Sequence, residues 1–195
     1  MMPEEIGARL VEVLGEGAAA SLSSGGGAFT RATVDVPLDR WADAVQAARD
    51  ELGCDFFDWL SAVDELADGF TIVAHLWSTG QRHGVLVRTR TPREAPAVAS
   101  VVALYPGAAW HERETHEMFG IAFPGHEELR PLLLAPEFEG HPLRKEFILA
   151  ARVAKPWPGA KEPGESSESA SRRQPMRPPG VPDPAEWGPG ARKGD

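Results

Sequence analysis

Two apolar runs joined by a short turn constrain the fold of this chain more than any other feature. Residues 84–91 carry three consecutive apolar side chains, and residues 70–78 place four apolar side chains on one face of a strand: Phe70, Ile72, Ala74 and Leu76. The connection, residues 79–81, contains Gly80 and suits a β-hairpin. The two runs are therefore predicted to pair as antiparallel strands.

Periodicity and end signals predict two helices in the first third of the chain. Helical spacing of apolar residues over 4–14, followed by Gly15, indicates the first. A second helix is predicted over residues 41–52, with Asp39 as its N-cap and Gly53 just past its end.

Two more strands and a third helix complete the predicted domain. The strands are expected over residues 28–36 and 55–63. The helix is expected over residues 108–119, with Trp110 and Met118 as candidate packing positions. Short neighbouring elements of both kinds predict an α+β fold, in which a mixed, largely antiparallel sheet carries its helices on one face.

The composition changes near the C-terminus. Residues 156–195 hold nine of the eighteen prolines, with six basic and six acidic side chains. Such a segment buries too little apolar surface to offset the entropy lost on ordering. We therefore expect an α+β domain over residues 1–155, followed by an extended C-terminal arm over residues 156–195 that is disordered or ordered by a partner.

Charge and cysteine content exclude several classes of function. A net charge of −9 argues against direct binding to nucleic acid or to an anionic membrane surface. The single cysteine, Cys54, cannot form an internal disulfide or hold an iron–sulfur cluster alone. No apolar run reaches the roughly 18 residues of a membrane span, and the first residues lack a secretory signal.

The stretch from residue 112 to residue 147 is poorly suited to a protein core. It carries two acid–base clusters, Glu112-Arg113-Glu114 and Arg144-Lys145-Glu146, and two Gly-His steps, Gly125-His126 and Gly140-His141. Such a density of charge, glycine, proline and histidine favours contact with another molecule.

The same stretch resembles one family, the 30 kDa subunit of the respiratory NADH-quinone oxidoreductase, which is also called complex I. The resemblance rests on two motifs in the right order: Glu112, Arg113, Glu114, Glu117, Met118-Phe119-Gly120-Ile121, Phe123, Gly125-His126 and Leu129-Arg130, then Gly140-His141-Pro142-Leu143-Arg144-Lys145.

The resemblance implies a non-catalytic subunit in the peripheral arm of a proton-translocating NADH:quinone oxidoreductase, on the cytoplasmic side of the cell membrane. It implies partners in the quinone-pocket subunit and its cluster-bearing neighbour, and membrane contact only through partners. FMN, iron–sulfur clusters, NADH and quinone then belong to other subunits. We expect this chain to hold no catalytic, cofactor-binding or metal site.

The resemblance also implies interface or loop-fixing roles for fourteen residues. They are Glu112, Arg113, Glu114, Glu117, Phe119, Gly120, Gly125, His126, Arg130, Gly140, His141, Pro142, Arg144 and Lys145.

The residues themselves leave local alternatives open. Arg113 and Glu117 are four apart on one helix face and can pair with each other. His126 and His141 each follow a glycine, which favours hydrogen-bonded loop anchors over catalysts. Arg144 can bind a carboxylate of a partner, or Glu112 and Glu114 within the chain.

Histidines 111 and 116 flank an acidic segment but do not fit a zinc protease motif. They are five residues apart, and this spacing places them about 140° apart around a helix of ~100° per residue.

Two further functions fit the same sequence. One is the equivalent subunit of a membrane-bound, energy-converting hydrogenase. The other is a free-standing acidic protein-interaction module that binds through its Pro-rich tail.

Overall fold

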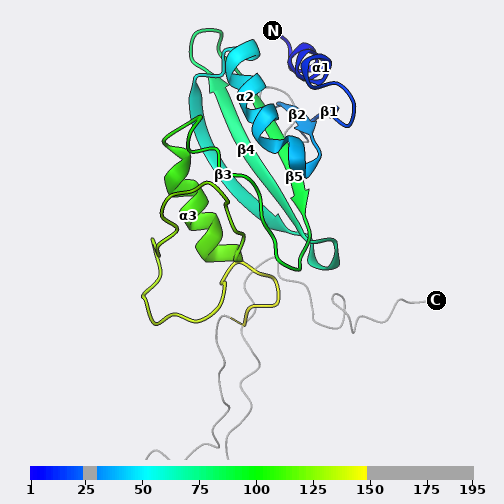
Figure 1. Cartoon of the computed structure of the whole chain (residues 1–195). Helices are drawn as coiled ribbons and strands as arrows, with labels where there is room; N and C mark the ends of the chain where they lie inside the picture. Colours follow the sequence, from blue (N-terminus) through cyan, green and yellow to red (C-terminus); the bar gives the residue numbers. More distant parts are fainter. Residues whose placement is uncertain (24–29, 149–195) are drawn as a thin grey trace, which may run out of the picture. The chain divides into compact units, whose positions relative to one another are not determined.

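A computed structural model describes residues 1–23 and 30–148 of the chain (Figure 1). In chain order the elements are α1 (Pro3–Leu14), β1 (Ala19–Leu22), β2 (Ala32–Asp35), the 3-10 turn η2 (Leu38–Arg40), α2 (Trp41–Leu52), β3 (Phe56–Asp64), the 3-10 turn η3 (Leu66–Asp68), β4 (Phe70–Ser78), β5 (His83–Thr91) and α3 (Ala108–Phe119).

The five strands form one mixed sheet in the order β1-β2-β5-β4-β3. Only β2 and β5 run parallel, and the other three pairs are antiparallel. The predicted hairpin is confirmed, since β4 and β5 pair continuously from Phe70 opposite Thr91 to Ser78 opposite His83. Strand β3 forms one edge, and its register against β4 shifts between Phe57 and Trp59.

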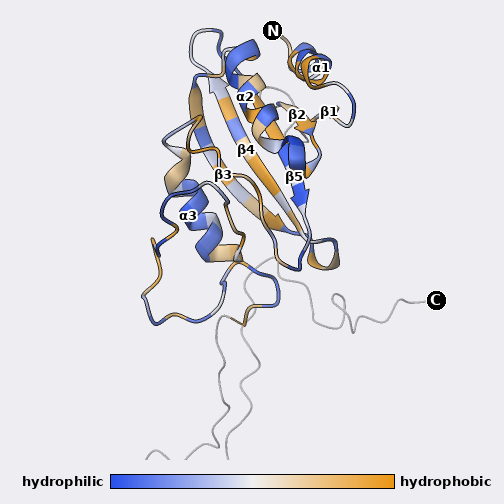
Figure 2. Ribbon diagram, viewed as in Figure 1, coloured by the Kyte–Doolittle hydropathy of each residue, from blue (hydrophilic) through white to orange (hydrophobic). Residues whose placement is uncertain are grey.

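The three helices lie over one face of the sheet, as Figure 1 shows. The strands alternate, so that one face buries its side chains beneath the helices, and β4 is largely apolar in Figure 2. The core on this face includes Trp41 from α2, Leu10 from α1, and Phe70 and Ile72 from β4, all 0–1% exposed. The predicted α+β fold is therefore confirmed.

Some local predictions need correction. Asp39 is not the N-cap of α2, because it lies inside η2 and the helix starts after Arg40 without a side-chain cap. Trp110 is not a packing position but is 62% exposed, whereas Met118 is buried as expected. Strand β1 was not predicted: its Ala and Ser residues have low strand propensity, and it forms through pairing with β2.

The predicted boundary between the domain and its C-terminal arm is not tested. The arm, residues 156–195, lies outside the described residues, and so do the first residues of the strand predicted over 28–36.

Candidate functional site

The charged stretch folds as α3 followed by a segment, residues 120–148, in which no described residue belongs to a named helix or strand. We call this segment the signature loop. Backbone amides and carbonyls outside helices and strands need other hydrogen-bond partners. Here side chains of α3 and of the loop itself supply many of them.

Two residues of α3 hold the middle of the signature loop. The Glu117 carboxylate accepts hydrogen bonds from the amides of Leu132, Leu133 and Leu134, at 3.1, 2.9 and 2.9 Å. Burial alone raises the pKa of Glu117, but these amides outweigh it and the pKa lies below its ordinary value. The carboxylate therefore stays charged near neutral pH.

Arg113 binds the same part of the loop through carbonyls instead of amides. Its Nε donates to the Arg130 carbonyl at 3.1 Å, and a terminal nitrogen donates to Pro131 at 2.9 Å. The predicted ion pair between Arg113 and Glu117 is not among those formed by the described residues. Both side chains bind loop backbone, which has no ladder of its own.

The two histidines anchor the loop at separate points. His126 donates from Nε2 to the Ala109 carbonyl at 3.2 Å and accepts at Nδ1 from the Glu128 amide at 3.0 Å. His141 donates from Nδ1 to the Glu117 carbonyl at 2.9 Å. These contacts agree with the interpretation of both as loop anchors.

Arg144 closes the loop onto the end of α3. Its Nε donates to the Phe119 carbonyl at 2.6 Å, and its guanidinium lies 5.3 Å from the centre of the Phe70 ring. Gly120 leaves room for this contact: its φ is +73°, and an added Cβ would lie 2.6 Å from Arg144 and 2.5 Å from His141.

The alternative in which Arg144 pairs with Glu112 or Glu114 is wrong. Glu112 is fully buried, and it accepts from the Ser100 hydroxyl at 2.6 Å and from the Val101 amide at 2.7 Å. Burial raises the pKa of Glu112 against the lowering effect of those donors. Glu114 is exposed on the outer side of α3.

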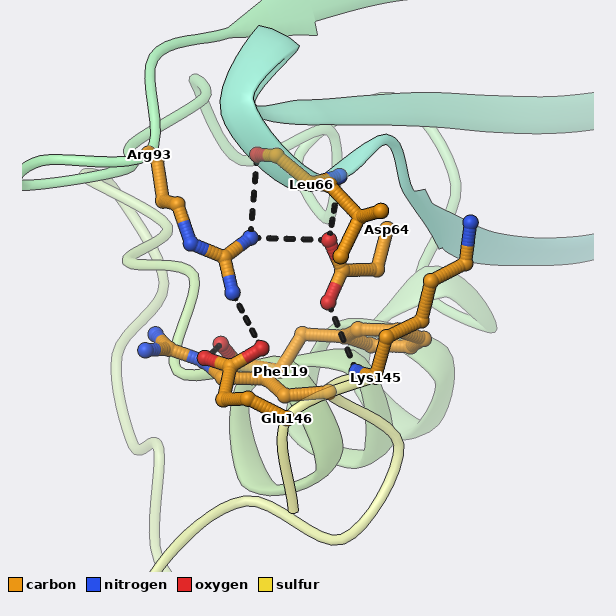
Figure 3. Close-up of polar contacts among 7 residues, drawn as sticks. Asp64, Leu66, Arg93, Phe119, Lys145 and Glu146 are labelled. Atoms are coloured by element: carbon orange, nitrogen blue, oxygen red, sulfur yellow. Dashed lines mark hydrogen bonds and ion pairs between the residues drawn. The ribbon is translucent and has the colours of Figure 1, made fainter. Parts of the chain in front are cut away.

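A cluster centred on Asp64 fixes the end of the signature loop to the sheet (Figure 3). The Asp64 carboxylate accepts from Arg93, from the Leu66 amide and from the Lys145 amide, each at 2.8 Å. Arg93 also forms an ion pair with Glu146. Burial alone would raise the pKa of Asp64, but the Lys145 amide and Arg93 lower it to about 2.

Sequence reasoning missed this cluster, although one signal was available. Leu60 and Ala62 are buried members of β3, and Asp64 continues the same alternation into the core. A carboxylate at a core position requires partners. Its partner Arg93 lies beyond β5, and its partner amide at Lys145 lies in the signature loop, so neither follows from local pattern.

The remaining predicted site residues divide between packing and the surface. Phe119 is buried against Phe70, with ring centres 6.1 Å apart, and Pro142 is half-buried. Gly125 and Gly140 have positive φ in turns. Arg130 and Lys145 are exposed.

Apolar side chains project from the loop and from α3. The largest exposed ones are Trp110, Leu133, Phe138, Leu143 and Ile148, with Trp110 and Leu133 each 62% exposed. Arg113 lies 5.4 Å from the centre of the Trp110 ring, so it joins α3 to the loop on this surface. A fixed loop that exposes several large apolar side chains is suited to binding another protein.

The described residues contain no group of three or more His, Cys, Asp or Glu side chains arranged to hold a metal ion. Cys54 is buried, and burial raises the pKa of its thiol to about 12, so it is not a reactive nucleophile. Among these residues, no helix has the length and apolar character needed to cross a membrane.

Comparison with known proteins points to one family. Residues 34–153 match the family described as the respiratory-chain NADH dehydrogenase 30 kDa subunit. A subunit of the NADH-quinone oxidoreductase of Bartonella bacilliformis is 40% identical over 153 residues, covering 76% of this chain and 72% of that protein. The equivalent subunit of Maricaulis maris is 40% identical over 129 residues, covering 64% of each chain.

Two solved structures share the fold. A chain of the membrane-bound sulfane sulfur reductase, an archaeal respiratory membrane complex, superposes with a TM-score of 0.63 and 28% identity, covering 75% of this chain and 85% of that one. A trypsin-resistant fragment of Nqo5 superposes with a TM-score of 0.53 and 25% identity, covering 65% and 99%.

Proposed function

We propose that this chain, which belongs to the 30 kDa subunit family of the respiratory-chain NADH dehydrogenase, works as a non-catalytic subunit in the peripheral arm of a proton-translocating NADH:quinone oxidoreductase. Its role is to dock against the subunit that forms the quinone pocket and against that subunit's cluster-bearing neighbour. In this way it supports electron transfer from NADH to quinone without performing bond chemistry.

The signature loop is the observation that carries this proposal. Residues 130–134 are held on both sides by α3, through Arg113 on the carbonyls and Glu117 on the amides. In the segment held by these contacts, Leu132 and Leu134 are half-buried, whereas Leu133 is exposed to solvent. A side chain presented from a loop that is already ordered loses little entropy on binding. We therefore assign Leu133 as an apolar anchor for a partner.

The charges around the loop suggest what the partner presents. On α3 and the signature loop, four exposed carboxylates have no interaction among the described residues: Glu114, Glu127, Glu137 and Glu139. A partner surface with an apolar pocket and basic residues at its rim complements this arrangement. Arg130 is occupied locally by Glu128, 3.4 Å away.

The proposal places every cofactor outside this chain. FMN, the iron–sulfur clusters, NADH and quinone are assigned to other subunits, and membrane attachment is assigned to partners on the cytoplasmic side of the cell membrane. A single buried cysteine is consistent with this division.

The test is recovery of the complex through a tag on this chain. Gently solubilised membranes should yield cluster-bearing and multi-span subunits together with NADH-dependent quinone reduction. Leu133→Asp should lower that recovery at least tenfold while the purified variant keeps the melting temperature of the wild type.

A matched control is Val13→Asp on α1, because Val13 is also an exposed aliphatic residue but lies outside the signature loop. It should leave recovery unchanged. Recovery of the chain alone from the soluble fraction would contradict the assembly role and favour the free-standing interaction module.

A second candidate follows from one comparison. The chain is also similar to a subunit of an archaeal sulfane sulfur reductase, a respiratory membrane complex. A complex of related architecture can therefore use a different electron donor or acceptor, as in an energy-converting hydrogenase. Cluster-bearing partners recovered without NADH oxidation would favour this alternative.

A further inference from the structure

The face of the sheet opposite the helices carries an apolar patch. The register of β3, β4 and β5 places on this face six apolar side chains, which we call the open-face patch: Phe56, Trp59, Val63, Val73, Trp77 and Leu86. Along the paired strands these side chains alternate with those of the core residues Leu60, Ala74 and Val87, so they point to the opposite face of the sheet. None of the three described helices covers this face (Figure 1).

The patch is built around an ordered row of rings. The His75 ring lies between Trp59 and Trp77, with centre-to-centre distances of 6.1 and 6.3 Å. Asp58 holds it through a 2.7 Å contact between its carboxylate and Nδ1. Gly84 lies beneath this row, since an added Cβ would come within 2.7 Å of His75 and 2.8 Å of Trp77. The rings of His75 and Trp77 therefore lie close against the backbone of the sheet at Gly84.

One end of this row already binds a cation from the chain itself. The Arg31 guanidinium lies 5.9 Å from the centre of the Trp77 ring. At the other end, Trp59 has no cation over it among the described residues, although it stands next to the half-exposed Asp58 carboxylate. Indole and carboxylate side by side are a suitable site for a second guanidinium or ammonium group.

The charges at the ends of β3 also favour binding of a basic group. Asp55 precedes the strand, and Glu65 and Asp68 follow it, all exposed. On β5, Arg88 is neutralised by a two-point contact with Asp35 at 2.7 and 2.9 Å, whereas Arg90 is exposed on the same face as Val63. The charged residues of β3 and its flanking turns are acidic, so the acidic edge of the sheet is the one that β3 forms.

The size of the patch indicates the kind of contact that it supports. Three strands of nine residues span roughly 14 by 30 Å, or about 420 Å², at the usual strand spacing and rise. A stable interface typically covers about 800 Å² on each partner. The patch alone is thus too small for a tight complex but large enough to add to one held elsewhere.

We propose that the open-face patch is a second docking surface, and that its occupant is a protein segment with apolar side chains and an arginine or lysine seated between Trp59 and Asp58. This surface is distinct from the signature loop and extends the proposed function, on which it rests, to a second contact. An anionic membrane is a poor fit to the acidic edge of β3.

The test uses single cysteines and maleimide labelling. The native Cys54 is buried with a raised pKa, so it does not label in the folded chain. Val63→Cys reports on the open face, and Glu12→Cys on the exposed side of α1 serves as the matched control. In the complex recovered through the tag, Val63→Cys should label at least tenfold more slowly than in the purified chain, and Glu12→Cys equally fast.

Each other outcome overturns the proposal. Equal labelling of Val63→Cys in both states shows that nothing covers the patch. Protection of the purified chain by phosphatidylglycerol vesicles identifies a membrane, and protection that grows with its own concentration identifies a second copy. Failure to recover any partner contradicts the proposed function as well, whereas recovery with an unprotected Val63→Cys contradicts only this inference.

A second variant tests the chemistry of the occupant. Asp58→Asn keeps an acceptor for His75 but removes the charge. At low salt, it should weaken the protection of Val63→Cys in the complex at least threefold. Raising the salt to 0.5 M should then lower this protection less than it does with Asp58, because the attraction that salt screens has been removed. Unchanged protection rejects the basic side chain. Circular dichroism of each variant checks that the sheet is intact.

Discussion

Replacing Asp64 by asparagine should destabilise the domain at neutral pH by an amount that its environment predicts. The pKa of Asp64 lies at about 2 in the folded chain, against an ordinary value of 3.8. Each unit of pKa difference is worth about 1.4 kcal/mol, so ionised Asp64 contributes about 2.5 kcal/mol at pH 7. In a domain of this size that corresponds to a fall in Tm of roughly 5–10 °C.

The pH dependence distinguishes this origin from a packing effect. A carboxylate whose pKa is lower in the folded than in the unfolded chain stabilises the fold. This stabilisation is fully present at pH values above the pKa of the unfolded state, and it is lost as the pH falls through the pKa of the folded state. The difference between wild type and Asp64→Asn should therefore be constant from pH 7 to about 5 and should shrink between pH 4 and 2. Urea unfolding followed by tryptophan fluorescence, at pH 7 and at pH 2.5, measures both free energies of unfolding.

A close control lies in the adjoining turn. Asp68 is exposed and has no side-chain hydrogen bond or ion pair, so Asp68→Asn removes the same charge without breaking the cluster. It should change the free energy of unfolding by less than about 0.5 kcal/mol. A loss for Asp64→Asn that is as large at pH 2.5 as at pH 7 would refute the electrostatic argument.

Two further substitutions test how the signature loop is held. Glu117→Gln leaves one acceptor oxygen for the three amides at 132–134, so hydrogen exchange at these amides should accelerate at least tenfold. The control is Glu114→Gln on the outer side of α3, which should leave the exchange rate of these amides unchanged. Gly120→Ala should lower stability by about 1–3 kcal/mol in thermal melts, because Gly120 has φ +73° and no room for a Cβ. Gly107→Ala is the matched control, since a Cβ there meets nothing within 4 Å and φ is −63°. Equal melting temperatures for the two alanine variants would contradict this account.

The helices and central strands were predictable because their apolar spacing reflects burial directly. The predicted bounds of β4 and α3 match the structure, and those of β3 and β5 differ by a residue at one or both ends. The family was also predictable, because its motifs combine residue types at fixed spacing. Strand β1 was not predictable, because all four of its residues are exposed and only its pairing with β2 defines it.

The partners of the site residues were the least predictable part. Arg113 and Glu117 have the spacing of a helical ion pair, but each binds backbone of a loop more than ten residues away. The spacing of residues in the sequence identifies neighbours on one helix. It does not show which backbone amides and carbonyls of a distant loop lack hydrogen-bond partners. For the same reason, Asp64 could not be connected to the Lys145 amide, 81 residues later.

These contacts change how the charged motif should work in assembly. Glu112, Glu117 and Arg144 all bind atoms of their own chain, so they order the surface and are not free to pair with a partner. Arg144→Glu therefore should not simply break an intermolecular ion pair. It brings a carboxylate beside the Phe119 carbonyl and removes the cation over Phe70, which releases residues 141–148 from α3. We expect a lower melting temperature together with weaker recovery of the complex, and lost recovery at an unchanged melting temperature would instead identify Arg144 as a direct contact.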